Sequence, residues 1–363
     1  MIINSKLIIL DMKHKIVILT GAGFPMMWNS PSSSDIKKMI SDIIKKQTNI
    51  TKSILSDLTK KDISFELVLA AMETLLYNKL RQNYLSLFQK SRKNNYDENI
   101  IWHLYKECIN SIIDKVKQYE DKALDCSNTK SKLFKDFYSY LSKCSSKINY
   151  YTLNYDEIVP QIICPTIDRS INYDIEKHLS LRKTFSNLHG SIYLNIANIG
   201  LGYEVIHNEF PQDLSDALIS NGGNPNEQLI FSPIITGVNK TQRILGDYFS
   251  HNVITFGIDL SLCDVLFIVG YSFSDPHINM LIKQYVVKRN KRIVLIDYNN
   301  PYYYTGKQNN IDNIITPKCQ YDQDTKEEDW FYLNGRELNV YKLGFESFIK
   351  NPQNWKTIIE SVN

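Results

Sequence analysis

KIVILTGAG, residues 15–23, is the stretch that decides the fold. Between Lys15 and Thr20 the run is aliphatic and rich in β-branched residues, which is typical of a strand covered on both faces of a parallel sheet. It ends in Gly21-Ala22-Gly23, where a glycine turn allows backbone N–H groups to approach a pyrophosphate. A plain tight turn is the more common explanation of G-A-G taken alone, so the function depends on the residues at the ends of the other strands.

Further extended runs follow along the chain, at Lys147–Leu153, Thr184–Leu188, Leu229–Phe231, Asp264–Val269, Arg292–Ile296 and Leu338–Leu343. Helical stretches accompany them, at Gln242–Phe249, His277–Lys288 and Trp355–Val362. Strands joined by helices in this way predict an α/β fold with a doubly wound, Rossmann-like parallel sheet. The polar stretch Pro301–Asp329, rich in Asn, Asp and Tyr, predicts a long surface loop.

The chain between the first two strands has a different character. From Asp35 to about Cys144 it follows helical periodicity with almost no Gly or Pro. We therefore expect a large helical insertion at 35–144 and a Rossmann domain built from 1–34 and 145–363.

Composition narrows the possible partners. The 363 residues carry 42 Lys and Arg against 39 Asp and Glu, a net charge of +3, so no direct nucleic-acid binding is predicted. Two basic stretches, Lys37–Lys61 and Lys79–Lys93, repeat apolar residues at helical spacing and are interpreted as solvated helix faces. The six cysteines include no C-x-x-C pair, so we expect no zinc module and no metal. No apolar run suits a signal peptide or a membrane span, which predicts a cytoplasmic protein without membrane contact.

Polar residues follow the predicted strands at their C-terminal ends, where parallel sheets bind ligands. The strand at 147–153 runs into Asn154-Tyr155-Asp156. These short side chains suit a ribose or a water molecule, and an Asx turn that caps the next helix explains them equally well. His189 follows the next strand and is a candidate general base, although a lone histidine is more often structural.

Two later strands end in similar chemistry. DVLFIV leads into Gly270-Tyr271-Ser272, a second turn able to hold phosphate or ribose. RIVLI leads into Asp297, and an acid at this edge commonly accepts the hydroxyls of an adenosine ribose, with a helix or turn cap as the equal alternative. Five strand ends of this kind in succession favour a nucleotide site over separate structural explanations.

The ordered set G-A-G, T-x-N-Y-D, L-H-G-S, G-Y-S-F-S-D-P and a strand-end acid resembles the sirtuin family. More narrowly, it resembles the sirtuin-like effector domains of bacterial anti-phage defence systems. The match spans about Lys15 to Asn299 in the correct order, with the helical insertion after the first motif.

The resemblance implies NAD⁺ as the substrate and a role for each matching residue. The phosphates would be surrounded by Gly21, Ala22, Gly23, Gly270 and Ser272, and Phe24 would also belong to the cofactor-binding residues. Asp297 would lie near the adenosine ribose, and Asn154, Asp156 and His189 would surround the nicotinamide ribose. In this picture Asn154 positions the ribose or the attacking water, and His189 is the base.

Two departures from the family change the expected reaction. Sirtuin deacylases carry a four-cysteine zinc module that these scattered cysteines cannot build, and Pro25 replaces the family's serine two residues after G-A-G. Without the module the case for an acyl-lysine groove weakens. The resemblance then implies an enzyme, an NAD⁺ glycohydrolase that releases nicotinamide and ADP-ribose and depletes NAD⁺ in abortive infection.

Two alternatives use the same site. One is a zinc-free NAD-dependent deacylase or ADP-ribosyltransferase, and the other is a non-catalytic sensor or scaffold that binds NAD⁺ or ADP-ribose. A toxic NADase must be restrained, so we expect a homo-oligomer or a partner. Single-domain relatives of this size imply a partner subunit of the HerA-type ATPase class.

Overall fold

The structure, a computed structural model, describes residues 14–46, 64–80, 98–163, 168–169, 175–193, 218–221, 224–230, 234–235, 249–298, 330–333 and 338–360. The chain divides into two units. The first comprises 1–29, 120–188 and 251–363, and the second comprises 30–119 and 189–250. The predicted surface loop at Pro301–Asp329 lies outside the described residues.

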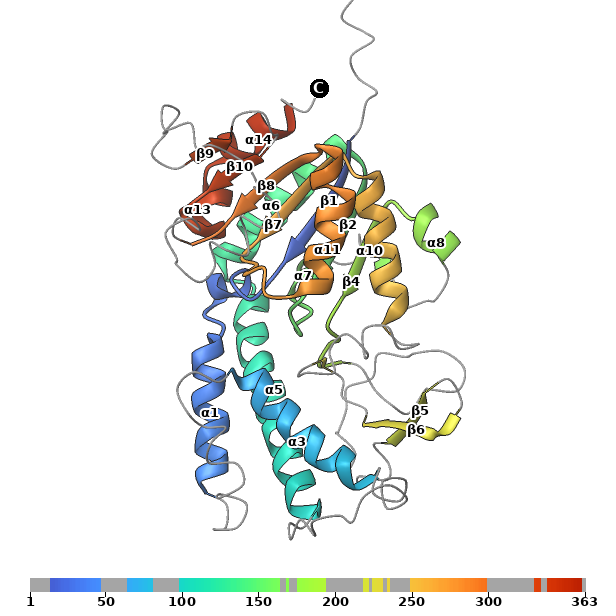
Figure 1. Cartoon of the computed structure of the whole chain (residues 1–363). Helices are drawn as coiled ribbons and strands as arrows, with labels where there is room; N and C mark the ends of the chain where they lie inside the picture. The colour runs from blue at the N-terminus through green and yellow to red at the C-terminus, as the bar shows by residue number, and fades with distance from the viewer. Residues whose placement is uncertain are drawn as a thin grey trace, which may run out of the picture. The chain divides into compact units, whose positions relative to one another are not determined.

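An eight-stranded sheet with the order β3-β4-β2-β1-β7-β8-β10-β9 forms the centre of the first unit (Figure 1). Its strands are β1 (His14–Thr20), β2 (Ser145–Thr152), β3 (Asp168–Arg169), β4 (Lys183–Asn187), β7 (Val265–Val269), β8 (Arg292–Ile296), β9 (Trp330–Leu333) and β10 (Leu338–Tyr341). Neighbouring strands are parallel except for β9 and β10. The strands progress outward from β1 first through β2 and β4, and later through β7 and β8. This doubly wound order confirms the predicted fold class, and it reverses between β1 and β7, where open α/β sheets bind ligands.

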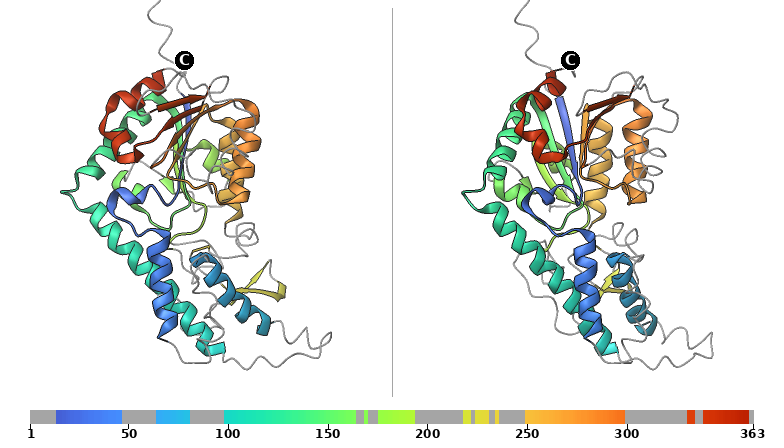
Figure 2. Two further views of the ribbon diagram at one scale, coloured as in Figure 1. Left: turned by 60° about the vertical axis from the view of Figure 1, so that its left-hand side comes forward. Right: turned by 90° about the vertical axis from the view of Figure 1, so that its left-hand side faces the viewer.

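Helices cover both faces of the sheet (Figure 2). On one face Val17 and Leu19 of β1 join a buried cluster with Phe256 of α10 (Ser250–Leu262) and Ile278 of α11 (Pro276–Tyr285). The other face is covered by α6 (Thr129–Cys144), α13 (Gly344–Lys350) and α14 (Pro352–Glu360). Because both faces are buried, residues 16–19 of β1 are all apolar and do not alternate with polar residues.

Several aromatic rings pack on the second face. Phe137 of α6 lies with its ring centroid 6.2 Å from that of Phe267 on β7 and 5.7 Å from that of Phe345 on α13. Phe134, one turn earlier on α6, lies 6.5 Å from Tyr150 of β2. Edge-to-face pairs at such separations add to the free energy gained by burial. This packing fixes α6 against the strands that lead into the candidate site.

The predicted helical segment is confirmed in the described residues. It contains α1 (Ser33–Lys45), α3 (Phe65–Leu80), α5 (Glu98–Leu124) and α6. A capping box starts α1, because the Ser32 hydroxyl accepts the Asp35 N–H and the Asp35 carboxylate accepts the Ser32 N–H at 2.9 Å. None of the described helices is both long and apolar enough to cross a membrane.

One predicted element differs from the structure, and another lies almost wholly outside the described residues. The sequence predicts Leu229–Phe231 as part of the parallel sheet, but β6 (Asn224–Ile230) pairs antiparallel with β5 (Leu218–Asn221) in a separate sheet, and Phe231 is outside the described residues. Two residues between strands allow only an antiparallel return, because a parallel crossover needs about a dozen. The helix predicted at Gln242–Phe249 lies outside the described residues except for Phe249. The next helix, α10, begins at Ser250 and was not predicted.

Several short elements were not predicted. They are η1 (Pro25–Trp28), α7 (Ile158–Ile163), β3, α8 (Ile175–Ser180), η4 (Val287–Arg289), β9 and α13. The helices among them have three to seven residues, too few to show a helical period, and β3 and β9 are defined by their pairing with β4 and β10.

Candidate functional site

The turns after β1 and β7 pack backbone against backbone. The Gly21 N–H donates to the carbonyl of Val269 at 2.9 Å, and the Gly23 N–H donates to that of Gly270 at 2.9 Å. A Cβ on Gly23 would lie 2.7 Å from the Gly270 Cα, and Gly270 itself has a φ of +59°. The close approach of the two turns therefore requires glycine at these positions, whether or not a ligand binds there.

The hydrogen bonds of these turns identify which amides a phosphate could use. The N–H groups of Gly21, Gly23 and Gly270 are bonded to carbonyls of the protein. The N–H groups of Ala22 and Ser272 have no partner among the described residues. Phosphate binding through this turn pair would accordingly use Ala22 and Ser272, while the glycines supply the space.

The residues after Gly23 turn into the core. Phe24 is 1% exposed, and its ring centroid lies 5.3 Å from that of Trp28 and 5.2 Å from that of Phe345. Trp28, at the end of η1, donates its Nε1–H to the Ser131 hydroxyl of α6 at 2.9 Å. The side chain of Phe24 therefore belongs to the core, and only its backbone borders the turn.

Asn154 lies against the first glycine turn. Thr152 of β2 is the register partner of Thr20 on β1, so the two strands end side by side. Asn154 is 8% exposed, and its Nδ2 donates to the carbonyl of Gly21 at 3.0 Å. Its backbone N–H donates to the Thr152 hydroxyl at 3.0 Å. With Nδ2 used inside the protein, Oδ1 is the atom that can accept a hydrogen bond from a ribose hydroxyl or a water molecule.

Asp156 is buried and lies just before α7. Its Oδ1 accepts the backbone N–H of Ile158 at 3.3 Å, which is the capping geometry that the sequence left open as an alternative.

Asn187, at the end of β4, supports this loop and was missed by sequence reasoning. Its Nδ2 is 3.4 Å from the carbonyl oxygens of both Asn154 and Asp156. Asn252 of α10 in turn donates to the Asn187 carbonyl at 2.9 Å. The available signal was an amide residue directly before L-H-G-S, near the end of the predicted strand Thr184–Leu188. Asn187 thus holds the backbone on both sides of Tyr155.

His189 comes two residues after β4 and is 2% exposed. The preceding residue, Leu188, donates its N–H to the Thr152 carbonyl at 2.8 Å and so extends the pairing of β4 with β2. The His189 carbonyl accepts the N–H of Ile235 at 2.8 Å. Gly190 follows with a φ of +83°, a conformation that favours glycine.

The second turn and the strand-end acid have structural partners of their own. The hydroxyls of Ser272 and Ser274 are 2.9 Å apart, and Phe273 has a φ of +56° with its carbonyl bonded by Asn279 at 2.8 Å. Asp297 directly follows β8, and its Oδ1 accepts the N–H of the next residue at 2.7 Å. Asp297 is thus bonded within its own loop, and it lies at the same sheet edge as the other candidate residues.

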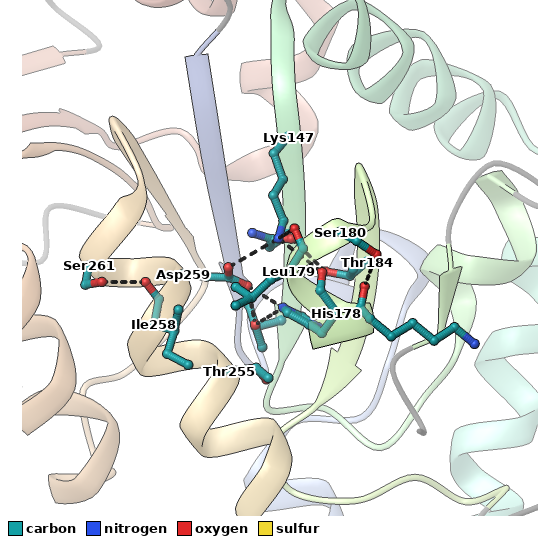
Figure 3. A network of polar contacts seen from close by, with 12 residues as sticks. Lys147, His178, Leu179, Ser180, Thr184, Thr255, Ile258, Asp259 and Ser261 are labelled. Atoms are coloured by element: carbon teal, nitrogen blue, oxygen red, sulfur yellow. Dashed lines mark hydrogen bonds and ion pairs between the residues drawn. The ribbon is translucent and has the colours of Figure 1, made fainter. Parts of the chain in front are cut away.

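A second buried polar cluster lies on the α10 face of the sheet (Figure 3). The Asp259 carboxylate accepts the Tyr151 hydroxyl at 2.6 Å, lies 2.7 Å from His178 Nε2 and 3.7 Å from Lys147 Nζ. Burial lowers the pKa of Lys147, an effect that Asp259 partly offsets, and burial raises the pKa of Tyr151 well above its ordinary value. The cluster joins β2, α8 and α10, and it was not predicted because its members are far apart in the chain.

Comparison with known proteins gives no match to a family model or to a curated protein. Among solved structures, a mutant Sir2 homologue in complex with 2′-O-acetyl ADP-ribose is 12% identical with a TM-score of 0.40, over 96% of this chain and 91% of that chain. Sir2Tm bound to a propionylated peptide is 12% identical with a TM-score of 0.40, over 94% and 93% of the two chains. A mutant Sir2 homologue in complex with ADP-ribose is 13% identical with a TM-score of 0.35, over 96% and 91%. The function is therefore inferred from the residues of the site.

Proposed function

We propose that the protein cleaves NAD⁺ at the bond between nicotinamide and ribose and releases nicotinamide and ADP-ribose. The observation that carries the proposal is the hydrogen bond from Asn154 Nδ2 to the Gly21 carbonyl. It joins the glycine turn after β1 to the polar loop after β2, next to the point where the strand order reverses. Nucleotides bind open α/β sheets in the crevice at such a point.

The proposed binding mode assigns the dinucleotide to these strand ends. The pyrophosphate would be held by the N–H groups of Ala22 and Ser272 and by the hydroxyl of Ser272. The closely packed glycine turns exclude side chains that would block it. Asp297, after β8, would accept the hydroxyls of the adenosine ribose.

The proposed chemistry uses three residues around the nicotinamide ribose. Asn154 would hold the attacking water or a ribose hydroxyl through Oδ1, and the Asp156 cap would fix the loop. As the glycosidic C–N bond breaks, nicotinamide leaves an oxocarbenium-like sugar that the pyrophosphate and polar neighbours stabilise. Water then forms the new C–O bond at the anomeric carbon and gives its proton to His189. No step requires a metal.

The proposed biology rests on the resemblance in sequence and on the toxicity of the reaction. Unrestrained NAD⁺ cleavage would exhaust the cell, which suits abortive infection in bacterial anti-phage defence. We therefore propose a cytoplasmic homo-oligomer whose activity is released by a separate subunit of the HerA-type ATPase class. The identity of the adjacent gene is the direct check of this pairing, and a stable monomer in solution, alone and with that gene's product, would contradict it.

The test is nicotinamide release from NAD⁺ by the full chain, alone and together with the product of the adjacent gene. Asn154→Ala and His189→Ala should each abolish release. His103→Ala is the matched control, because His103 is an exposed histidine of α5. No release under any of these conditions would contradict the proposal. Tight NAD⁺ binding without turnover, unchanged by His189→Ala, would instead indicate a sensor.

A further inference from the structure

The last turn of α5 contacts the loop that carries Asn154. Residues 120–188 belong to the same unit as the sheet. Glu120 is 1% exposed, and its Oε1 accepts the backbone N–H of Glu157 at 2.5 Å. Glu157 directly follows Asp156, so a carboxylate on a helix holds the backbone at the end of the T-L-N-Y-D motif.

The same turn is connected to the loop after G-A-G. The Ala123 carbonyl accepts the hydroxyl of Ser131, and that hydroxyl oxygen accepts Trp28 Nε1–H. Lys130 Nζ donates to the Met27 carbonyl at 2.6 Å. η1 begins two residues after Gly23. The last turn of α5 therefore bonds directly to the loop after β2 and, through Ser131, to Trp28 in the segment after Gly23. These two segments meet at the Asn154–Gly21 hydrogen bond.

Burying a carboxylate at a position that serves packing alone costs desolvation free energy. Its removal from water must be offset by strong hydrogen bonds. An apolar side chain of similar volume would fill the same space without that cost. A carboxylate that accepts a backbone N–H makes a short, directional bond and so fixes where the backbone lies. The chemistry of Glu120 therefore favours control of loop position.

We propose that Glu120 is a positioning residue for NAD⁺ cleavage. Its carboxylate sets the backbone of residues 153–157 so that the Asn154 amide reaches the Gly21 carbonyl. This inference rests on the proposed function and adds the last turn of the inserted helix to the machinery of the site. Because the dinucleotide phosphates are assigned to the β1 and β7 turns, loss of the bond lowers kcat and leaves KM for NAD⁺ nearly unchanged.

The test compares Glu120→Leu with Glu120→Gln in the full chain. Leu fills the volume without an acceptor, whereas Gln keeps an oxygen that can accept the Glu157 N–H. Hydrogen exchange of peptides covering 153–158 is measured beside kcat and KM. In Glu120→Leu the Glu157 amide should exchange about 10-fold to 100-fold faster, with kcat reduced by a similar factor, as expected for one bond to a charged group. Glu120→Gln should stay within about 10-fold of wild type in both.

Glu107→Leu is the control, because Glu107 is an exposed glutamate of the same helix, and it should match wild type. Wild-type exchange and kcat in Glu120→Leu would overturn the proposal, as would equal losses in the Leu and Gln variants. If the wild-type chain releases no nicotinamide, the proposed function fails, while exchange at Glu157 still decides whether Glu120 holds the loop. Thermal melting of each variant shows that the comparison is made between folded proteins.

Discussion

Gly270→Ala should destabilise the protein strongly, because two glycine turns share the space that its side chain would occupy. A Cβ at Gly270 would lie 2.5 Å from the Cα and the carbonyl carbon of Gly23 and 2.6 Å from the nitrogen of Phe24. The positive φ costs an alanine about 1–2 kcal/mol. Displacing the facing backbone costs about 1–3 kcal/mol more, by analogy with overpacked cores. We expect the free energy of unfolding to fall by about 2–5 kcal/mol, which lowers the Tm of a chain of 363 residues by roughly 3–7 °C.

Gly257→Ala is the matched control. Gly257 lies within α10, where an added Cβ would be 3.5 Å from Tyr285 Cε2 and 3.6 Å from Leu281 Cδ2, both ordinary contacts. Alanine in place of a helical glycine stabilises by about 0.5–1 kcal/mol. Scanning calorimetry of the three proteins at equal concentration should therefore show the two Tm values moving in opposite directions. If Gly270→Ala had the same Tm as wild type or as Gly257→Ala, the close backbone packing of the two turns would be refuted.

Three further predictions concern the supports of the site and the helices. Asp259→Asn should lower the free energy of unfolding, measured by urea titration, by about 3–5 kcal/mol, because it removes the carboxylate from the buried polar cluster that includes His178. A change below about 1 kcal/mol would contradict this network. Asn187→Ala should slow nicotinamide release about 10-fold with NAD⁺ affinity retained, because it removes the hydrogen-bond donor to two carbonyls of the loop after β2. Turnover equal to wild type would show that the loop keeps its position without Asn187. The Ser32 hydroxyl and N–H hold the pKa of Asp35 below its ordinary value of 3.8. The capping box therefore stabilises α1 above pH 3.8, and this stabilisation is lost as the pH falls through the lowered pKa of Asp35. The NMR chemical shift of the Ser32 amide should titrate with a midpoint below 3.8. A midpoint at or above 3.8 argues against the capping box.

The central sheet could be predicted because its buried strands leave a simple pattern. The central residues of β1, β7 and β8 are uninterrupted apolar runs covered on both faces, and a glycine or an acid directly follows each strand. β6 was predicted in the wrong sheet because its apolar end resembles a core strand, while its pairing depends on β5 a few residues earlier. β3, with two residues, has no pattern to recognise.

The candidate site could be predicted in part, for a physical reason. Neighbouring parallel strands end at one edge, so the closeness of Asn154 to Gly21 follows from strand order alone. Asn187 and Glu120 could not be identified in this way. Glu120 sits on a long helix with many charged residues, and only the loop that brings Glu157 to it shows that this carboxylate is buried. Burial of a polar group depends on partners distant in sequence, which a single sequence does not reveal.

The central claim is that water alone completes the reaction at the Asn154 site. The most direct measurement is the product balance of a reaction that contains NAD⁺ and the full chain, with the adjacent gene's product where activation requires it, and no acyl-lysine peptide or acceptor protein. Nicotinamide and ADP-ribose should appear in equal amounts, and Asn154→Ala should yield neither. Intact NAD⁺ would contradict the account, and so would NAD⁺ loss that begins only when an acyl-lysine peptide or acceptor is added.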